Sequence, residues 1–208
     1  MTVTWPELYF VRHGETNWNA EGRYQGSQDI PLNDVGRAQA DLNGRLLARL
    51  LQRAGRAPTA FTWHVSPLGR TLENRARIRA AFADPLPEPV PDRRLIEVSF
   101  GIYEGRLHTE LAAGEMAMAG ERDADFWYFR PPSGESYEDV AQRVMSFGAE
   151  LCGPAIIVAH GGILRILRRL IEDFPAERAV NWFPPQDCVV HFIDGKSVLY
   201  PAGQSWDD

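Results

Sequence analysis

Short apolar runs alternate along this chain with longer stretches in which apolar residues recur every three or four positions. The runs at 8–11, 61–65 and 154–159 have the length of strands, and the last is typical of a strand buried in a parallel sheet. An amphipathic helix is predicted between Asn33, which can cap it, and Gly55. This alternation predicts an α/β fold with a mostly parallel central sheet and helices on both faces.

Three more capping or turn signals extend this pattern. Ser66, followed by Pro67, predicts the start of a second helix directly after the second strand. Ser136 and Asp139 have the spacing of a capping box and precede a stretch with one apolar side. Asp194-Gly195 between two apolar runs predicts a hairpin near the end of the chain.

The segment 106–130 contains two short helical patterns rich in alanine and methionine, and it includes the aromatic residues 126–129. We expect a single domain over residues 1–208, with a small helical lid at about 103–134 over the carboxyl edge of the sheet. The aromatic residues are either core packing or a wall of this lid that selects the organic part of a substrate. The stretch 17–31 has no helical or strand period and predicts an ordered loop.

The first and the last of the three apolar runs are both followed closely by histidine and glycine. Arg12-His13-Gly14 combines a planar anion binder, a side chain that titrates near neutral pH and a residue that allows close backbone approach. His160-Gly161-Gly162 follows the last run, and taken alone its histidine could be a core residue. Because parallel sheets bind ligands at the carboxyl ends of their strands, the pair of histidines predicts a phosphate site at that edge.

Together with several dispersed segments in the same order, these residues resemble the histidine phosphatase (phosphoglycerate mutase-like) superfamily. The glycine pair after His160 resembles its phosphatase branch. The resemblance runs from about residue 8 to about residue 167 and rests on Arg12 through Thr16, Trp18-Asn19, Gly22-Arg23, Gln25-Gly26, Asp29 through Asn33, Gly36 through Ala40, Ser66 through Thr71, Glu97 through Gly105 and His160 through Gly162.

The resemblance implies a phosphoglycerate mutase-like fold and a reaction through phosphohistidine. It implies that His13 attacks phosphorus and that Glu97 transfers the proton. The side chains implied to hold the phosphoryl group are those of Arg12, Arg70 and His160. The residues implied to bind the rest of the substrate or to line the site are Asn19, Gln25, Gly26 and Gly161.

The surroundings of Arg70 and Glu97 agree with these roles but also allow plainer ones. Arg70 falls in the first turn of the predicted second helix, where free N–H groups and the helix dipole favour an anion; alone, it could be a surface arginine. Glu97 follows Leu95 and Ile96, and apolar neighbours favour the uncharged carboxyl group that a general acid needs. Otherwise it is a surface glutamate on an alternating strand.

The chain departs from the family pattern at Glu73-Asn74-Arg75, where Gln-Thr-Ala is usual. This departure leaves the hydrogen bonds around Arg70 open, and Arg75 is expected to be exposed. Glu135 and Ser136 either contact substrate or stabilise the turn before a helix. For Glu104 we expect a structural role.

Composition narrows the class of protein. The 208 residues are 44% hydrophobic and 24% charged, with a formal net charge of −6 and no basic stripe, so we expect no nucleic-acid partner. No segment reaches the roughly 18 apolar residues of a membrane span and no signal peptide precedes the first strand, so we expect a cytoplasmic protein without membrane contact. Cys152 and Cys188 are expected to be free thiols, and because no two histidines have metal spacing we expect no metal or cofactor.

Three functions remain open. The first is a phosphomonoester hydrolase that acts on a small phosphorylated metabolite and needs no metal, because its arginines supply the positive charge. The second is a phosphoglycerate mutase, which is disfavoured because the insertion is short and offers only Arg106, Arg122 and Arg130. The third is a phosphate-binding protein without turnover. We expect a monomer or a homodimer.

Overall fold

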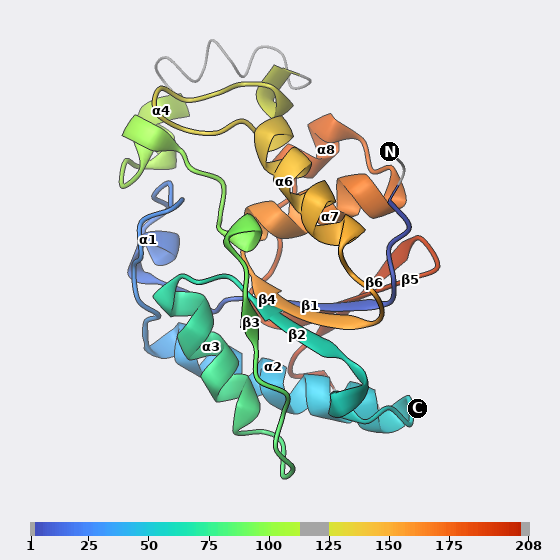
Figure 1. Cartoon of the computed structure of the whole chain (residues 1–208). Coiled ribbons are helices and arrows are strands. Elements are labelled where there is room, and N and C mark those ends of the chain that lie inside the picture. The colour runs from blue at the N-terminus through green and yellow to red at the C-terminus, as the bar shows by residue number, and fades with distance from the viewer. Residues whose placement is uncertain (1–2, 113–124, 205–208) are drawn as a thin grey trace.

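The computed structural model describes residues 3–112 and 125–204 and contains a twisted sheet between two layers of helices (Figure 1). The sheet has six strands in the order β3-β2-β4-β1-β5-β6. Four strands are parallel: β1 (Leu8–Arg12), β2 (Thr62–Val65), β3 (Val90–Pro91) and β4 (Ala155–Ala159). The last two, β5 (Cys188–Ile193) and β6 (Lys196–Pro201), form the predicted hairpin and run antiparallel. The predicted α/β class is therefore confirmed.

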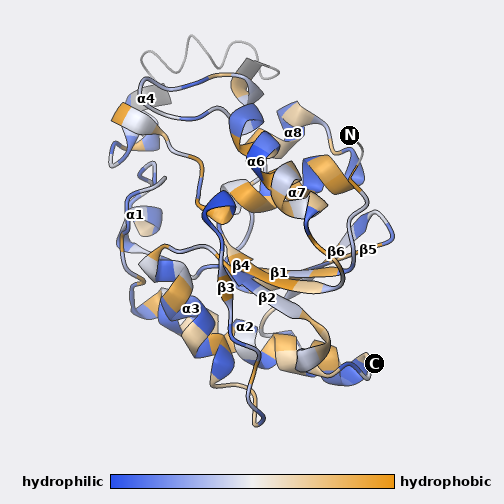
Figure 2. Cartoon of the chain, in the orientation of Figure 1, coloured by the Kyte–Doolittle hydropathy of each residue, from blue (hydrophilic) through white to orange (hydrophobic). Residues whose placement is uncertain are grey.

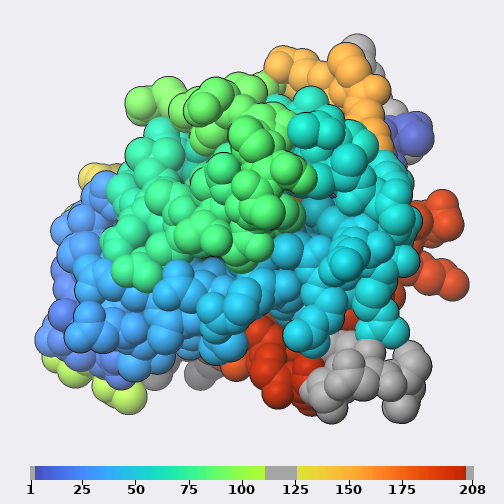
Figure 3. All heavy atoms as spheres, turned by 90° about the horizontal axis from the view of Figure 1, so that it is seen from below, coloured from blue at the N-terminus to red at the C-terminus, as the bar shows by residue number. Residues whose placement is uncertain are grey.

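Helices cover both faces of this sheet (Figure 1). One face carries α2 (Asp34–Arg53) and α3 (Gly69–Arg79), which form much of the surface seen from below in Figure 3. The other face carries α6 (Tyr137–Ala149), α7 (Gly161–Glu172) and α8 (Ala176–Asn181). The remaining described helices and 3-10 turns are short: α1 (Asn17–Ala20), α4 (His108–Ala112), η1 (Pro58–Ala60), η2 (Arg93–Leu95), η3 (Gly101–Tyr103) and η4 (Asp125–Trp127).

Successive strand residues pack into two separate cores, one on each face of the sheet, because side chains alternate between the faces. Leu8 and Phe10 of β1 pack with α6 and α7 in one core, while Tyr9 and Val11 pack with α2 and α3 in the other. Strand β4, whose five residues are all buried, is coloured as hydrophobic in Figure 2, because both of its faces are covered by helices. Each fully buried aliphatic or aromatic side chain contributes about 1.5–3 kcal/mol, so these cores hold the sheet edge rigidly.

The structure confirms two of the three predicted helix caps and contradicts the third. Asn33 caps α2 by accepting from Gly36 N, and Ser136 caps α6 in a full capping box. Ser66 does not cap α3, which begins at Gly69 after Leu68 without a side-chain cap. The stretch 17–31 is not wholly a loop either, because Thr16 caps the short helix α1.

The predicted lid is described only at its two ends, since residues 113–124 lie outside the described part of the chain. At its start, Tyr24 N donates to the Arg106 carbonyl at 2.9 Å, which ties the lid to the loop after α1. At its end, Trp127 is 2% exposed within the core between the sheet and α6, whereas Tyr128 is 66% exposed. The aromatic run therefore supplies both core packing and exposed surface. Among the described helices, none is long and apolar enough to cross a membrane.

Candidate active site

The carboxyl ends of three neighbouring parallel strands bring together His13, His160 and Ser66. Each follows its strand directly, and the backbone ladder continues into them: His13 N donates to the Ala159 carbonyl at 2.9 Å, and Ser66 N donates to the Val158 carbonyl at 3.1 Å. The centroids of the two imidazole rings lie 5.1 Å apart. Ser66 Oγ lies 2.7 Å from His160 Nε2, so this serine positions a histidine instead of capping a helix.

The hydrogen bonding of His13 fixes which of its nitrogens is free. Nδ1 lies 2.7 Å from the Gly14 carbonyl oxygen, and because a carbonyl can only accept, Nδ1 carries the proton. Nε2 is then the nitrogen with a lone pair. Burial, followed by the charges of Arg70 and Arg12, holds the pKa of His13 well below its ordinary value. The side chain is thus a neutral base at physiological pH.

Two arginines of the site, the half-buried Arg12 and the buried Arg70, donate to backbone carbonyls. Arg70, in the first turn of α3 and 1% exposed, donates from Nη1 to the Gln28 carbonyl at 2.7 Å and from Nη2 to the Gly26 carbonyl at 2.8 Å. Arg12 donates to the Pro184 carbonyl. Burial lowers the pKa of Arg12 to about 10 and also lowers that of Arg70, while the Glu97 carboxylate opposes both shifts. Both guanidinium groups therefore stay charged at neutral pH.

Within the described residues, several site side chains have buried polar nitrogens that lack a hydrogen-bond partner. They are Arg12 Nε, Arg70 Nε, His160 Nδ1 and Gln25 Nε2. An unpaired buried donor ordinarily costs about 1–3 kcal/mol, and a ligand that accepts from such nitrogens would offset that cost. Cationic and neutral N–H donors that share one buried region suit a tetrahedral oxyanion such as a phosphoryl group.

Glu97 lies in an extended segment after η2, not on the alternating strand that was one of its predicted settings, and it is 8% exposed. Its carboxylate accepts from Val98 N at 2.9 Å and from Gly162 N, in the first turn of α7, at 3.1 Å. A Cβ at Gly162 would lie 2.2 Å from Glu97 Oε1, so only glycine allows this approach. Similarly, a Cβ at Gly161 would come within 3.2 Å of Arg12 Nε.

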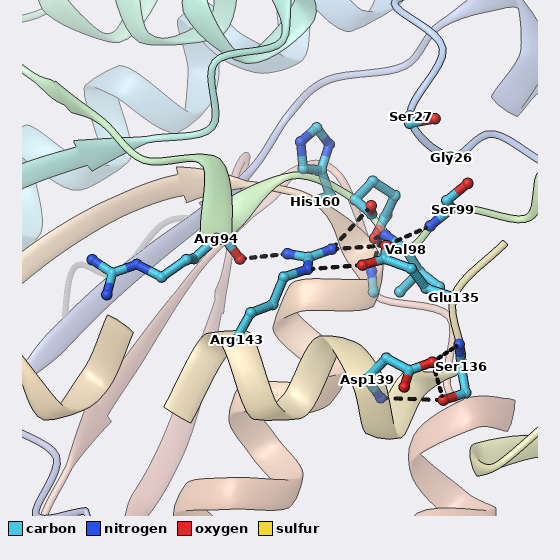
Figure 4. Close-up of polar contacts among 12 residues, drawn as sticks. Gly26, Ser27, Arg94, Val98, Ser99, Glu135, Ser136, Asp139, Arg143 and His160 are labelled. Carbon is cyan, nitrogen blue, oxygen red and sulfur yellow. Dashed lines mark hydrogen bonds and ion pairs between the residues drawn. The ribbon is translucent and has the colours of Figure 1, made fainter. Parts of the chain in front are cut away.

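The backbone that carries Glu97 is held from α6. Arg143 donates to the carbonyl oxygen of Arg94 and pairs with the Glu135 carboxylate at 3.2 Å (Figure 4). It also donates to the carbonyl oxygen of Glu97 at 3.3 Å. Glu135 also accepts from Ser99 N at 3.1 Å. Both contacts give Glu135 a structural role.

Glu104 is structural as well, as expected. Its carboxylate accepts from the backbone N–H groups of Ser27, Gln28 and Phe100 at 3.0–3.1 Å. These bonds tie the loop that follows α1 to the segment that follows Glu97.

The loop residues predicted to bind substrate form a network of amides beside His13. Asn19 Nδ2 donates to Gln25 Oε1 at 3.0 Å, and the same oxygen accepts from Thr16 Oγ1 at 2.6 Å. Gln186 Nε2 donates to Asn19 Oδ1 at 2.9 Å and to the His13 carbonyl at 3.3 Å. Asn19 thus uses its amide on protein partners, and the amide nitrogen of Gln25 is the one left for a ligand.

Sequence reasoning missed two residues of this region. Gln186 lies in a proline-rich turn before β5 that shows no motif, and nothing local marks it. Arg165, in α7, follows the second His-Gly pair and could have been found from that spacing. It donates to the Trp182 carbonyl at 2.6 Å and to Tyr137 Oη at 2.7 Å, and its charge reaches Arg12.

The departure at 73–75 is accommodated by specific contacts. Asn74 is fully buried, and its Oδ1 accepts from Gly14 N at 3.0 Å. Glu73 pairs with Arg37 at 2.8 Å. Arg75 is 7% exposed, with its guanidinium 4.7 Å from the Trp63 ring centroid, so the expectation that it is exposed is wrong. The face of α3 that carries it packs under the sheet, where a cation–π contact and the Pro87 carbonyl replace water.

Among the described residues, no three or more histidine, cysteine, aspartate or glutamate side chains are grouped so that they could hold a metal ion. The model of the "Histidine phosphatase superfamily (branch 1)" matches residues 8–197. The metal-independent phosphoserine phosphatase of Arabidopsis thaliana is 30% identical over 213 residues, which cover 97% of this chain and 81% of that protein.

Two further relatives broaden the comparison. A probable phosphoglycerate mutase of Escherichia coli is 31% identical over 206 residues, which cover 94% of this chain and 88% of that one. The solved structure of a mycobacterial glucosyl-3-phosphoglycerate phosphatase superposes with a TM-score of 0.73 at 25% identity and covers 90% of each chain. Proteins named as phosphatases and one named as a probable mutase are therefore among the relatives of this chain.

Proposed function

Because the chain belongs to the histidine phosphatase superfamily, we propose that it is a metal-independent phosphomonoester hydrolase that acts through a phosphohistidine on a small phosphorylated metabolite. One observation carries the proposal. A neutral histidine with a free Nε2 shares the site with buried, unpartnered nitrogens of two arginines and a second histidine. This is the arrangement that an in-line attack on a phosphoryl group requires.

In the first step, His13 Nε2 attacks phosphorus while the bond from phosphorus to the substrate oxygen breaks. Glu97 gives its proton to the departing oxygen, so the product leaves as an alcohol. Arg12, Arg70 and His160 hold the three phosphoryl oxygens and stabilise their charge in the transition state. The proton on Nδ1 stays hydrogen-bonded to the Gly14 carbonyl throughout.

In the second step, the Glu97 carboxylate takes a proton from a water molecule whose oxygen attacks phosphorus. The bond between Nε2 and phosphorus breaks, and the neutral histidine and inorganic phosphate are restored. The same residue thus serves as acid and then as base, and the cycle needs no outside reactant except water. Two arginines and the buried histidine supply the stabilisation of charge that metal ions supply in other phosphoryl-transfer enzymes.

The direct test is hydrolysis of an aryl phosphate in EDTA by the wild type and by His13→Ala. We expect turnover in the wild type and a loss of at least about 1,000-fold in the variant, because removing a nucleophile removes the covalent route. Arg75→Met, whose contacts are with the Trp63 ring and the Pro87 carbonyl, is the matched control and should keep full activity. A folded His13→Ala protein with wild-type turnover would disprove the role of His13.

The second candidate is a phosphoglycerate mutase, and one observation favours it. Arg165 adds a third cation close to Arg12, where it can bind a second anionic group of a substrate. The Escherichia coli relative named as a probable mutase agrees with this possibility. Activity that depends on a bisphosphoglycerate primer and interconverts phosphoglycerates without releasing phosphate would favour the mutase.

A further inference from the structure

The two peptide units that follow His13 are both held by carboxamide side chains from distant parts of the chain. In the first peptide, Gly14 N donates to Asn74 Oδ1 at 3.0 Å, and the His13 carbonyl accepts from Gln186 Nε2 at 3.3 Å. In the second peptide, Glu15 N donates to Gln39 Oε1 at 2.8 Å. The carbonyl of that second peptide is the one that takes the Nδ1 proton of His13.

These peptides lie against α2, which leaves little room for other arrangements. A Cβ on Gly14 would lie 2.1 Å from the Gly36 carbonyl oxygen. Asn74 is fully buried on α3, and because a backbone N–H can only donate, its amide must present the oxygen to Gly14. Its own Nδ2 has no partner in the described part of the chain, which is the cost of using the oxygen here.

We propose that Asn74 is a positioning residue that sets the tautomer of His13. Asn74 accepts from Gly14 N on one side of Gly14, while Gln39 holds the N–H of the peptide that contains the Gly14 carbonyl; together they keep this carbonyl on the Nδ1 proton and Nε2 as the free base. Without Asn74, Gly14 N loses its acceptor and the hold on the neighbouring carbonyl weakens, so a neutral imidazole can place its proton on either nitrogen. A histidine protonated at Nε2 has no lone pair with which to attack phosphorus. The rate of turnover would therefore fall in proportion to the fraction of His13 in that tautomer.

The effect on rate rests on the proposed function, but the effect on the tautomer does not. The test is therefore ¹⁵N NMR of the imidazole nitrogens of His13, combined with steady-state kinetics, on Asn74→Leu and Asn74→Asp. Leucine keeps the branched shape of the side chain and removes the acceptor, whereas aspartate keeps an acceptor oxygen. We expect Asn74→Leu to populate the Nε2–H form and to lose about 10- to 100-fold in kcat, with KM changed less than about threefold. Asn74→Asp should keep the wild-type tautomer.

Arg75→Met is the matched control on the same helix. It removes a buried hydrogen bond to the Pro87 carbonyl and a contact with Trp63, but it touches nothing at His13. We expect a lower stability with an unchanged tautomer and an unchanged kcat. If Asn74→Leu does not fold, Gln186→Met provides a second test. Gln186 is half-buried, and the substitution removes the donor to the His13 carbonyl at the other end of the first peptide. It should shift the tautomer of His13 in the same direction.

A folded Asn74→Leu protein whose His13 still carries its proton on Nδ1 would overturn the inference, whatever its rate. A wild type without turnover would instead overturn the proposed function, and the NMR result would still decide the role of Asn74.

Discussion

Mild acid should destabilise this protein because two neutral histidines are buried side by side. The pKa of His13 and that of His160 are both held well below 6.5, first by burial and then by neighbouring positive charges, Arg70 foremost. In the unfolded chain each histidine regains an ordinary pKa near 6.5. Below that pH the unfolded state binds two protons that the folded state does not, so stability is lost as the pH falls.

The size of the effect follows from linkage. Between pH 7.5 and 5.5, each histidine that stays neutral in the folded state lowers the free energy of unfolding by about 1.4 kcal/mol, so the pair lowers it by about 2.7 kcal/mol. Carboxylates with lowered pKa values, such as Asp92, lose their contribution only at more acidic pH and leave this window unaffected. This loss is a large share of the free energy of unfolding, which is about 5–15 kcal/mol for most domains.

The assay is urea denaturation at a series of pH values in buffer free of phosphate and sulfate, since a bound anion would stabilise the folded state. His13→Gln and His160→Gln should each remove about 1.4 kcal/mol of the pH-dependent loss, and the double variant about 2.7 kcal/mol. His64 and His108, whose pKa values burial also lowers, keep their own contribution in all of these variants. The comparison uses the slope of the free energy of unfolding against pH and not its absolute value, because each substitution also changes packing. A double variant with the slope of the wild type would refute the reasoning.

Two substitutions test other features of the fold. Gly162→Ala places a Cβ 2.2 Å from Glu97 Oε1. We expect kcat to fall by about 100-fold while the circular dichroism spectrum stays unchanged. Gly153→Ala is the control, because nothing lies within 4 Å of its Cβ. Trp127→Ala should lower the free energy of unfolding by about 3–5 kcal/mol, whereas Tyr128→Ala at 66% exposure should change it by less than about 1 kcal/mol. Equal effects of the last two would contradict the placement of Trp127 in the core.

The sequence by itself determined the parts of the fold that depend on near neighbours. Apolar runs marked the buried strands, and the caps at Asn33 and Ser136 were predictable because the capped N–H groups lie three residues away. The meeting of His13 with His160 was also predictable, because parallel strands share their carboxyl edge. The largest cause of the lowered pKa of His13 is burial, which only the packed structure shows, and the charges of Arg70 and Arg12 follow.

Only the tertiary structure decided which partner each side chain chooses. Ser66 could cap a helix or hold His160, and it holds the histidine because β2 and β4 are neighbours. Arg75 is buried by the packing of α3 under the sheet. Gln186, which lies 173 residues from His13 along the chain, carries no local signal at all. Such choices depend on contacts between residues far apart in the sequence, and these form only when the sheet and its helices pack together.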